Sequence, residues 1–106
     1  MNYRFMRIMV FFDLPMETSA EVRAYNAFRK FLIKEGFIMM QKSVYTKLTL
    51  NGTVSSSVKA AIKKNLPPKG LIEMLEITER QFGNIEYLLG HSQSDVLDSD
   101  DRTVEI

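Results

Sequence analysis

The chain has 106 residues, which is enough for one domain built around one hydrophobic core. Hydrophobic residues make up 45% of the sequence, charged residues make up 25%, and there is no cysteine, so the composition excludes a disordered chain, a disulfide framework, a cysteine zinc site and thiol catalysis. The net charge of +1 hides an uneven distribution, because residues 1–72 hold twelve Lys and Arg against four Asp and Glu, whereas residues 73–106 hold two against nine.

The first predicted element is a buried strand. Residues 3–12 are nearly all large and apolar, which is typical of a strand covered on both faces, and Pro15 prevents its continuation. A helix is predicted next, because Thr18 and Glu21 have the spacing of a capping box and helical periodicity continues to Gly36. The apolar face of this helix contains Ala24, Tyr25, Phe28, Phe31 and Leu32.

The middle of the chain predicts further strands and a second helix. The predicted strands are residues 37–40, 43–50, 71–78 and 85–89, and the predicted helix is residues 54–66, with Val54, Val58 and Ile62 directed inward. The order β-α-β-β-α-β, followed by an extra C-terminal strand, is typical of an α+β protein with a ferredoxin-like sandwich.

One face of such a sheet has no helices, so we expect a homodimer that covers it, with residues 85–89 pairing with the partner's sheet edge. From His91 onward Ser, Asp and Gln dominate the composition. We therefore predict a folded domain at residues 1–90 and an acidic tail at residues 91–106 that docks on a partner or acts as a solvating segment. No apolar run approaches the roughly 18 residues of a membrane span, and no secretory signal is evident, so we expect a cytoplasmic protein without membrane contact.

Asp13 is the candidate residue for chemistry. It is the first acidic residue of the chain and stands where the buried strand enters a loop. One interpretation is a turn-forming aspartate that caps nearby backbone amides before Pro15. The other is an oxygen ligand for Mg²⁺, or alternatively Mn²⁺, which usually takes one or two carboxylates and fills its other positions with water and phosphate. Two copies of Asp13 facing each other in a symmetric dimer satisfy that need.

The other reactive side chains are weaker candidates for catalysis or metal binding than Asp13. His91 is the only histidine, so a single chain cannot build a two-histidine metal site, and its neighbours favour an exposed loop. Ser43 and Tyr45 have no base near them in the sequence, so a serine-type hydrolase is poorly supported.

The basic residues of the first two-thirds predict contact with a polyanion. Arg23, Lys30 and Lys34 share one face of the first helix, and Lys42 and Lys47 lie in the following strand region. Contacts of this kind neutralise phosphates without reading bases. Because no exposed aromatic residues for base stacking are apparent, a duplex is favoured over single strands. The alternative is that surface charge merely varies along the chain.

These residues resemble a known family, the small CRISPR-associated adaptation protein Cas2. The resemblance covers about residues 4–90. It depends on a first strand that ends in an aspartate (VFFDLP, residues 10–15), on a helix that closes at Gly36, and on QKSVY at residues 41–45. The stretches RKFL (29–32), GFIM (36–39) and SVYTKL (43–48) are most similar to the type II-A variant.

The resemblance implies a homodimer in a prokaryotic cytoplasm that bridges two dimers of the Cas1 integrase and holds the double-stranded prespacer while spacers enter the CRISPR array. The family's strand-one aspartate maps onto Asp13, and in some members a pair of them binds a divalent metal and supports phosphodiester cleavage. The tail residues expected to dock on the integrase by strand addition are Thr103, Val104, Glu105 and Ile106. Phe12 stands where a tyrosine is common, and no arginine follows Asp13 within the next four residues.

Two functions therefore remain open from the sequence. The first is a non-catalytic scaffold for the prespacer duplex, with Asp13 structural or weakly metal-binding. The second is a Mg²⁺-dependent endonuclease that cleaves RNA or DNA through paired Asp13 carboxylates. A small-molecule regulatory domain of the same fold is a third reading, but its expected glycine-lined loop is missing.

Overall fold

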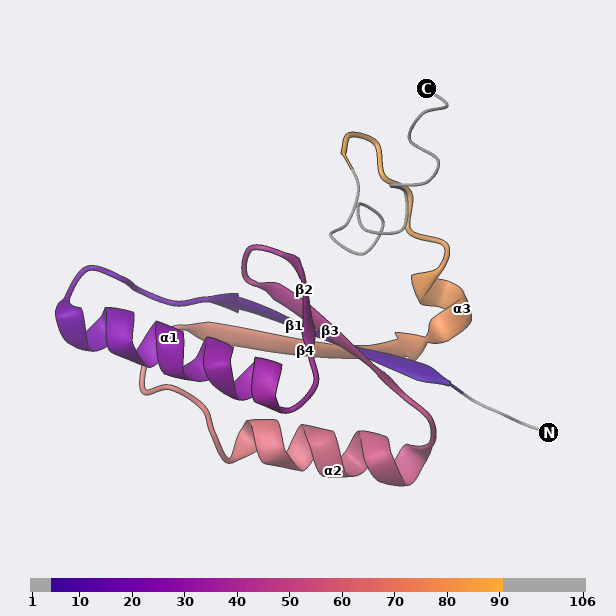
Figure 1. Cartoon of the computed structure of the whole chain (residues 1–106), viewed down its shortest axis with the longest axis horizontal. Helices are drawn as coiled ribbons and strands as arrows, with labels where there is room; N and C mark the ends of the chain where they lie inside the picture. Colours follow the sequence, from indigo (N-terminus) through magenta and orange to yellow (C-terminus); the bar gives the residue numbers. More distant parts are fainter. Residues whose placement is uncertain (1–4, 91–106) are drawn as a thin grey trace.

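The computed structural model describes residues 5–90, which form a four-stranded antiparallel sheet and three helices (Figure 1). In chain order the elements are β1 (Met6–Asp13), α1 (Ser19–Lys34), β2 (Ile38–Gln41), β3 (Val44–Thr49), α2 (Gly52–Lys63), β4 (Leu71–Thr78) and α3 (Glu79–Phe82). The strand order is β2-β3-β1-β4, so β1 is central and pairs with β3 and β4. This is the ferredoxin-like arrangement, and the predicted α+β class is confirmed.

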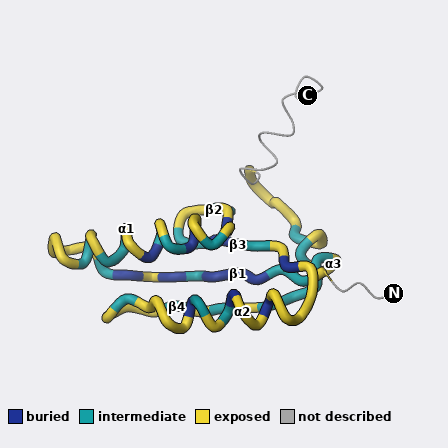
Figure 2. Tube along the Cα trace, turned by 60° about the horizontal axis from the view of Figure 1, so that its bottom comes forward, coloured by how far each residue is buried: buried dark blue, intermediate teal, exposed yellow. Residues whose placement is uncertain are grey.

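The core lies between β1 and the two long helices. Because side chains alternate along a strand, Ile8, Val10 and Phe12 share one face, and all three are buried. They pack with residues of α1 and α2, namely Phe28, Leu32, Val58 and Ile62. Figure 2 shows the buried residues concentrated along β1 and on the inner sides of these helices. The helices therefore cover one face of the sheet, and the odd-numbered residues of β1 point to the other.

The helix α1 begins and ends at the residues that the local sequence predicts, a capping box at its start and a glycine after its end. The Thr18 hydroxyl accepts a bond from the Glu21 backbone N–H at 3.1 Å, and the Glu21 carboxylate accepts from the Thr18 N–H at 3.1 Å, which confirms the capping box. The helix ends at Lys34, and Gly36 then adopts a φ of 97°, a left-handed conformation that favours glycine. The chain thereby turns back so that Phe37 is buried.

The helix α2 starts earlier than predicted. The Asn51 side chain accepts a bond from the Val54 N–H at 3.0 Å, so the helix begins at Gly52 and the first turn faces solvent. The prediction that Val54 points inward is therefore wrong: Val54 is exposed, and Ser55 occupies the buried position. Within residues 5–90, no helix has the length and apolar character needed to cross a membrane.

The face of the sheet opposite α1 and α2 is apolar and partly exposed. Leu48 on β3, Leu71 and Leu75 on β4, and Ile38 on β2 are exposed large hydrophobic residues, and Leu75 keeps 48% of its accessible surface. The register places the leucines of β3 and β4 beside odd-numbered residues of β1, for example Leu75 opposite Met9 and Leu48 opposite Arg7, and it places Ile38 opposite Thr46, the β3 partner of Met9. We call this surface the open face.

The extra strand predicted at residues 85–89 is not formed in the single chain. After β4 the chain forms the short helix α3, and residues 85–90 then continue without regular structure. The segment is apolar, as the prediction assumed, but a strand also needs a neighbouring strand with which to form hydrogen bonds. In Figure 1 this segment leaves the sheet beyond α3, on the side away from α2.

Candidate carboxylate site and nucleic-acid interface

Asp13 is the last residue of β1 and is exposed. It lies opposite Leu71, the first residue of β4, and belongs to the odd-numbered residues that point to the open face. Within residues 5–90 its carboxylate takes part in no ion pair and no hydrogen bond. The structure therefore places Asp13 as the sequence predicts, at the point where a buried strand meets solvent.

Two neighbouring loops hold the end of β1 in place. The Phe12 N–H donates to the Ser43 carbonyl at 3.0 Å, and Ser43 has a positive φ of 66° in the turn between β2 and β3. On the other side, Gly70 has a φ of 110°, and a Cβ atom there would lie 2.5 Å from the Leu14 side chain and 2.9 Å from the Asp13 carbonyl oxygen. A glycine is therefore needed for the loop before β4 to pass this close to Asp13.

A shallow depression of about 170 Å³ lies at this end of the open face. Its lining consists of Phe11, Phe12, Asp13, Ser43, Val44, Leu71 and Glu73. Glu73 is a candidate metal ligand that the sequence did not predict. It pairs with Phe11 in the β1–β4 register, two positions from the partner of Asp13, so the two carboxylates share one face. Only the register reveals this, because 60 positions of sequence separate the two residues.

The donor set of the depression fits a hard divalent cation in part. Asp13 and Glu73 supply carboxylate oxygens, and Ser43 supplies a hydroxyl. No group of three or more His, Cys, Asp or Glu side chains suited to a metal ion occurs within residues 5–90. One chain thus offers two carboxylates, which matches Mg²⁺ when water and phosphate oxygens fill the other positions.

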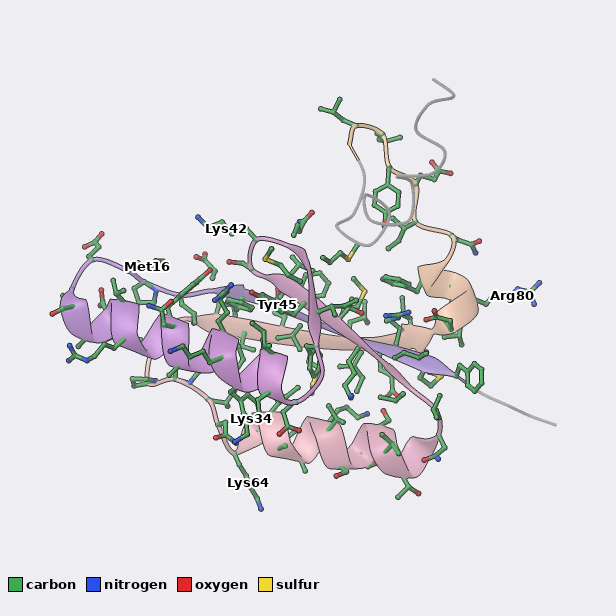
Figure 3. All side chains as sticks on the ribbon, viewed as in Figure 1. Met16, Lys34, Lys42, Tyr45, Lys64 and Arg80 are labelled. Atoms are coloured by element: carbon green, nitrogen blue, oxygen red, sulfur yellow. The ribbon has the colours of Figure 1, made fainter. Side chains whose placement is uncertain are left out.

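Tyr45 is a structural residue and not a free nucleophile. It is 1% exposed, its ring stacks on Phe12 with centroids 5.6 Å apart, and it lies in the middle of the molecule in Figure 3. Its hydroxyl accepts a hydrogen bond from the Arg29 Nε at 2.9 Å. The phenol therefore has a hydrogen-bond partner, and Arg29 links α1 to β3.

The predicted phosphate-binding residues lie on several elements. Arg23, Lys30 and Lys34 are all exposed on α1, and Lys42 is exposed at the β2–β3 turn. Figure 3 shows that Lys42 and Lys34 lie well apart, so these cations do not form a single cluster. Lys47 differs from the others, because it is half-buried on β3 and its Nζ lies 2.6 Å from the position of a Cβ built on Gly36. Its ammonium group thus covers the C-terminal end of α1, where a cation is favourable.

A second depression, of about 190 Å³, lies between the start of α1 and the prolines after α2. Its lining includes Leu14, Pro15, Tyr25 and Pro67, and its charged rim is the Glu21–Lys69 pair at 3.7 Å. The Thr18 and Glu17 backbone N–H groups hold the pKa of Glu21 below its usual value. Because this pocket is mostly apolar, it offers no set of groups for phosphate chemistry, and the candidate site remains at Asp13.

The predicted tail contacts, Thr103, Val104, Glu105 and Ile106, lie outside the described residues, as does His91. The fold and site together define a small ferredoxin-like protein with an exposed carboxylate at the end of its first strand. The family model for CRISPR associated protein Cas2 matches residues 6–85. The chain therefore belongs to the Cas2 family of CRISPR-associated proteins.

Relatives of this family are similar over nearly the whole chain. The CRISPR-associated endoribonuclease Cas2 of Treponema denticola is 50% identical over 99 residues, which cover 93% of this chain and 98% of the relative. The proteins of the same name from Streptococcus mutans and Ligilactobacillus salivarius are 46% and 43% identical, again over 93% of this chain, and the matches cover 91% and 98% of those relatives. The recognition made from the VFFDLP and QKSVY stretches is confirmed.

Proposed function

We propose that this protein acts in CRISPR adaptation as a homodimer that holds a DNA duplex and bridges the Cas1 integrase. The observation that carries this proposal is the contrast between two surfaces. The open face is apolar, whereas Arg23, Lys30, Lys34 and Lys42 project their charges from α1 and the β2–β3 turn. Membership of the Cas2 family supports the same role. Under this proposal the protein works in the cytoplasm of a prokaryote.

The homodimer is proposed because the open face needs a cover. Exposed apolar side chains that share one sheet face favour association, and a second copy is the simplest partner of matching chemistry. Residues 85–89 supply a further apolar segment, which pairs with the partner's sheet edge in this proposal. A dimer of this kind leaves the cations of α1 in solvent.

The duplex is held through its phosphates in this proposal. Arg23, Lys30, Lys34 and Lys42 are exposed and free to move toward a backbone, and Lys47 adds positive charge at the end of α1. Contacts of this type neutralise phosphates and carry no base sequence information. The acidic tail at 91–106, with Thr103–Ile106 as a strand, is proposed to dock on the integrase and thereby to keep negative charge away from the duplex.

A second candidate function is a Mg²⁺-dependent endonuclease. Asp13 and Glu73 line one depression on the open face, and a two-fold axis through this face brings two such pairs toward each other. Curated relatives carry the name endoribonuclease. When bound there, Mg²⁺, or Mn²⁺ in its place, supplies an activated water and neutralises phosphate charge. The residues that would hold it are Asp13 and Glu73.

The two functions are separated by replacing Asp13. We expect Asp13→Asn, which keeps the side-chain shape and removes the charge, to leave spacer acquisition with Cas1 within about twofold of wild type if the scaffold role is correct. Acquisition is measured in cells by expansion of the CRISPR array, and cleavage of labelled RNA and DNA is measured with purified protein and Mg²⁺. Glu17→Gln serves as the control, because Glu17 is an exposed acid in the loop before α1.

Each outcome decides between the candidates. Retained acquisition together with abolished cleavage supports the scaffold and assigns cleavage to Asp13 as a separate activity. Loss of acquisition and of cleavage together, with the Glu17 control normal and the dimer intact, contradicts the scaffold role. Cleavage that survives in the Asp13 variant contradicts the endonuclease mechanism.

A further inference from the structure

Arg7 is a charged residue on the open face whose interactions serve no purpose in the proposed chemistry. It lies on β1 opposite Leu48 and Ile77, and only 13% of its side chain is exposed. Its Nε donates to Glu79 Oε1 at 2.8 Å, and its Nη2 donates to Glu79 Oε2 at 2.6 Å. Its guanidinium carbon also lies 4.3 Å from the centre of the Phe82 ring. One side chain of β1 therefore holds both ends of α3.

The helix α3 depends on such contacts for its position. It has four residues, and a helix of one turn is not stable alone. Within α3 and its N-cap, the capping box between Thr78 and Gln81 stabilises the helical turn, but it does not attach the helix to the sheet. Among the contacts that hold α3 on the sheet are the Arg7 interactions with β1 and the bond from the Glu79 N–H to the carbonyl of Phe5, the residue before β1, at 3.0 Å.

The segment that follows α3 presents apolar side chains to solvent. Leu88 is 90% exposed, Leu89 is 95% exposed, and Tyr87 is also exposed. We call residues 85–90 the arm. Because α3 connects β4 to the arm, the direction in which the arm leaves the sheet depends on how α3 is held (Figure 1).

We propose that Arg7 is a positioning residue that locks α3 against β1, directs the arm toward a second copy of this chain, and thereby sets how tightly two copies associate. This inference rests on the proposed homodimer and adds the residue that controls it. It concerns the geometry of association and is independent of Asp13 and of any nuclease activity.

The lock needs both of its charged partners. A lone guanidinium on an apolar face opposes burial of that face, whereas a bidentate pair with Glu79 is neutral as a unit and presents the flat side of Arg7 to Phe82. Removing either partner breaks this pair and leaves α3 without its bidentate contact to β1. The effect on association is therefore expected from Arg7 and from Glu79 alike.

The test measures the dimer dissociation constant of the full chain by sedimentation equilibrium over a range of concentrations. We expect Arg7→Met and Glu79→Gln each to raise this constant by about tenfold or more, and Arg7→Lys, which keeps the charge but loses the fork, to have an intermediate effect. The matched control is Arg80→Gln on the same helix, because Arg80 is exposed and points away from the sheet in Figure 3.

A thermodynamic cycle that combines the Arg7 variant with a variant of the arm distinguishes positioning of the arm from a general structural role of Arg7. Leu88→Ser combined with Leu89→Ser weakens association by itself, and in that background Arg7→Met should add less than about twofold, because the lock acts through the arm. Amide hydrogen exchange of β1 and β4 should remain protected in Arg7→Met while α3 exchanges faster.

Each result bears on one proposal or on both. A wild-type dimer with an unchanged constant in Arg7→Met overturns the inference and leaves the homodimer standing. An effect of Arg7→Met that is equally large in the arm variant also overturns it, since Arg7 would then act on the interface directly. A wild type that stays monomeric at every concentration overturns the homodimer and this inference together.

Discussion

The carboxylate of Glu76 shows how a single residue inside the helix-covered face is kept charged. It lies on β4 opposite Ile8, and Lys59 on α2 places its Nζ 2.6 Å from one carboxylate oxygen while the Ser55 hydroxyl donates to the other. These bonds, first that from Lys59 and then that from Ser55, hold the pKa of Glu76 below its usual value. Folding therefore favours the ionised form. The resulting stabilisation is complete above the ordinary pKa of 4.5 and is lost as the pH falls through the lower pKa of the folded state.

Replacing Glu76 should accordingly have a pH-dependent cost. We expect Glu76→Gln to lower the free energy of unfolding by about 1–3 kcal/mol at pH 7, because it leaves Lys59 and Ser55 with a neutral partner. Near pH 3 the difference should shrink, since the wild-type carboxylate then also takes up a proton. Denaturant unfolding at both pH values measures this, with Glu17→Gln as the exposed control. Equal differences at the two pH values would contradict the assignment to ionised Glu76.

At the same scale, the sequence predicts some site residues and cannot predict others. Asp13 is visible because a long apolar run ends in one acid. Glu73 is not visible, because its proximity to Asp13 depends on the pairing of β1 with β4, which the sequence does not encode as a local pattern. Lys47 is a lysine on a predicted strand, so its sequence context suggests a surface cation. In the structure its side chain lies over Gly36, because the chain reverses after α1 and β3 then passes the C-terminal end of that helix.

At the scale of elements, local signals specify helix starts better than strands. The capping box of Thr18 and Glu21 fixes α1 as predicted, whereas α2 begins at Gly52 because the Asn51 cap moves the start and turns Val54 outward. An apolar run at residues 85–89 predicts a strand only if a sheet edge is available for pairing, and within residues 5–90 the sheet consists of β2, β3, β1 and β4 without this run. Helix positions can thus be predicted from residues that are close in sequence, whereas the formation of a strand depends on a pairing partner that can be distant in sequence.

The helix α1 carries a prediction about nucleic acid. Neutralising Arg23, Lys30 and Lys34 together, each to Gln, should weaken binding of a DNA duplex and flatten its salt dependence. Each phosphate contact that is lost reduces the slope of log affinity against log salt by about 0.9. Fluorescence anisotropy at about 50 mM and 200 mM salt measures both quantities. Arg80→Gln on α3 is the control for loss of charge, and a triple variant that binds with the wild-type slope would exclude α1 from the interface.

At the scale of the whole molecule, the two sides of the sheet have different chemistry. The helix-covered side is closed by Phe28, Leu32, Val58 and Ile62, whereas the open face exposes leucines on β3 and β4. A single copy cannot bury both sides with two long helices on one of them. The acidic pair Asp13 and Glu73 lies at one end of the open face, and the Arg7–Glu79 lock involves the same face of β1. Association through this face therefore connects the carboxylate site, α3 and the arm.

Placing a charge at the centre of the open face tests that association directly. Leu75 lies opposite Met9 and is 48% exposed in one copy, so Leu75→Glu should cost the monomer little, whereas in a dimer it buries an unpaired carboxylate. Such burial costs about 3–5 kcal/mol, which raises the dissociation constant by roughly 100-fold or more. Light scattering should then give a mass near 12.2 kDa, that of one chain. Leu66→Glu is the matched control, because Leu66 is equally exposed but lies after α2, beside the helices. A dimer that tolerates the charge at Leu75 as well as at Leu66 would place the contact between copies elsewhere.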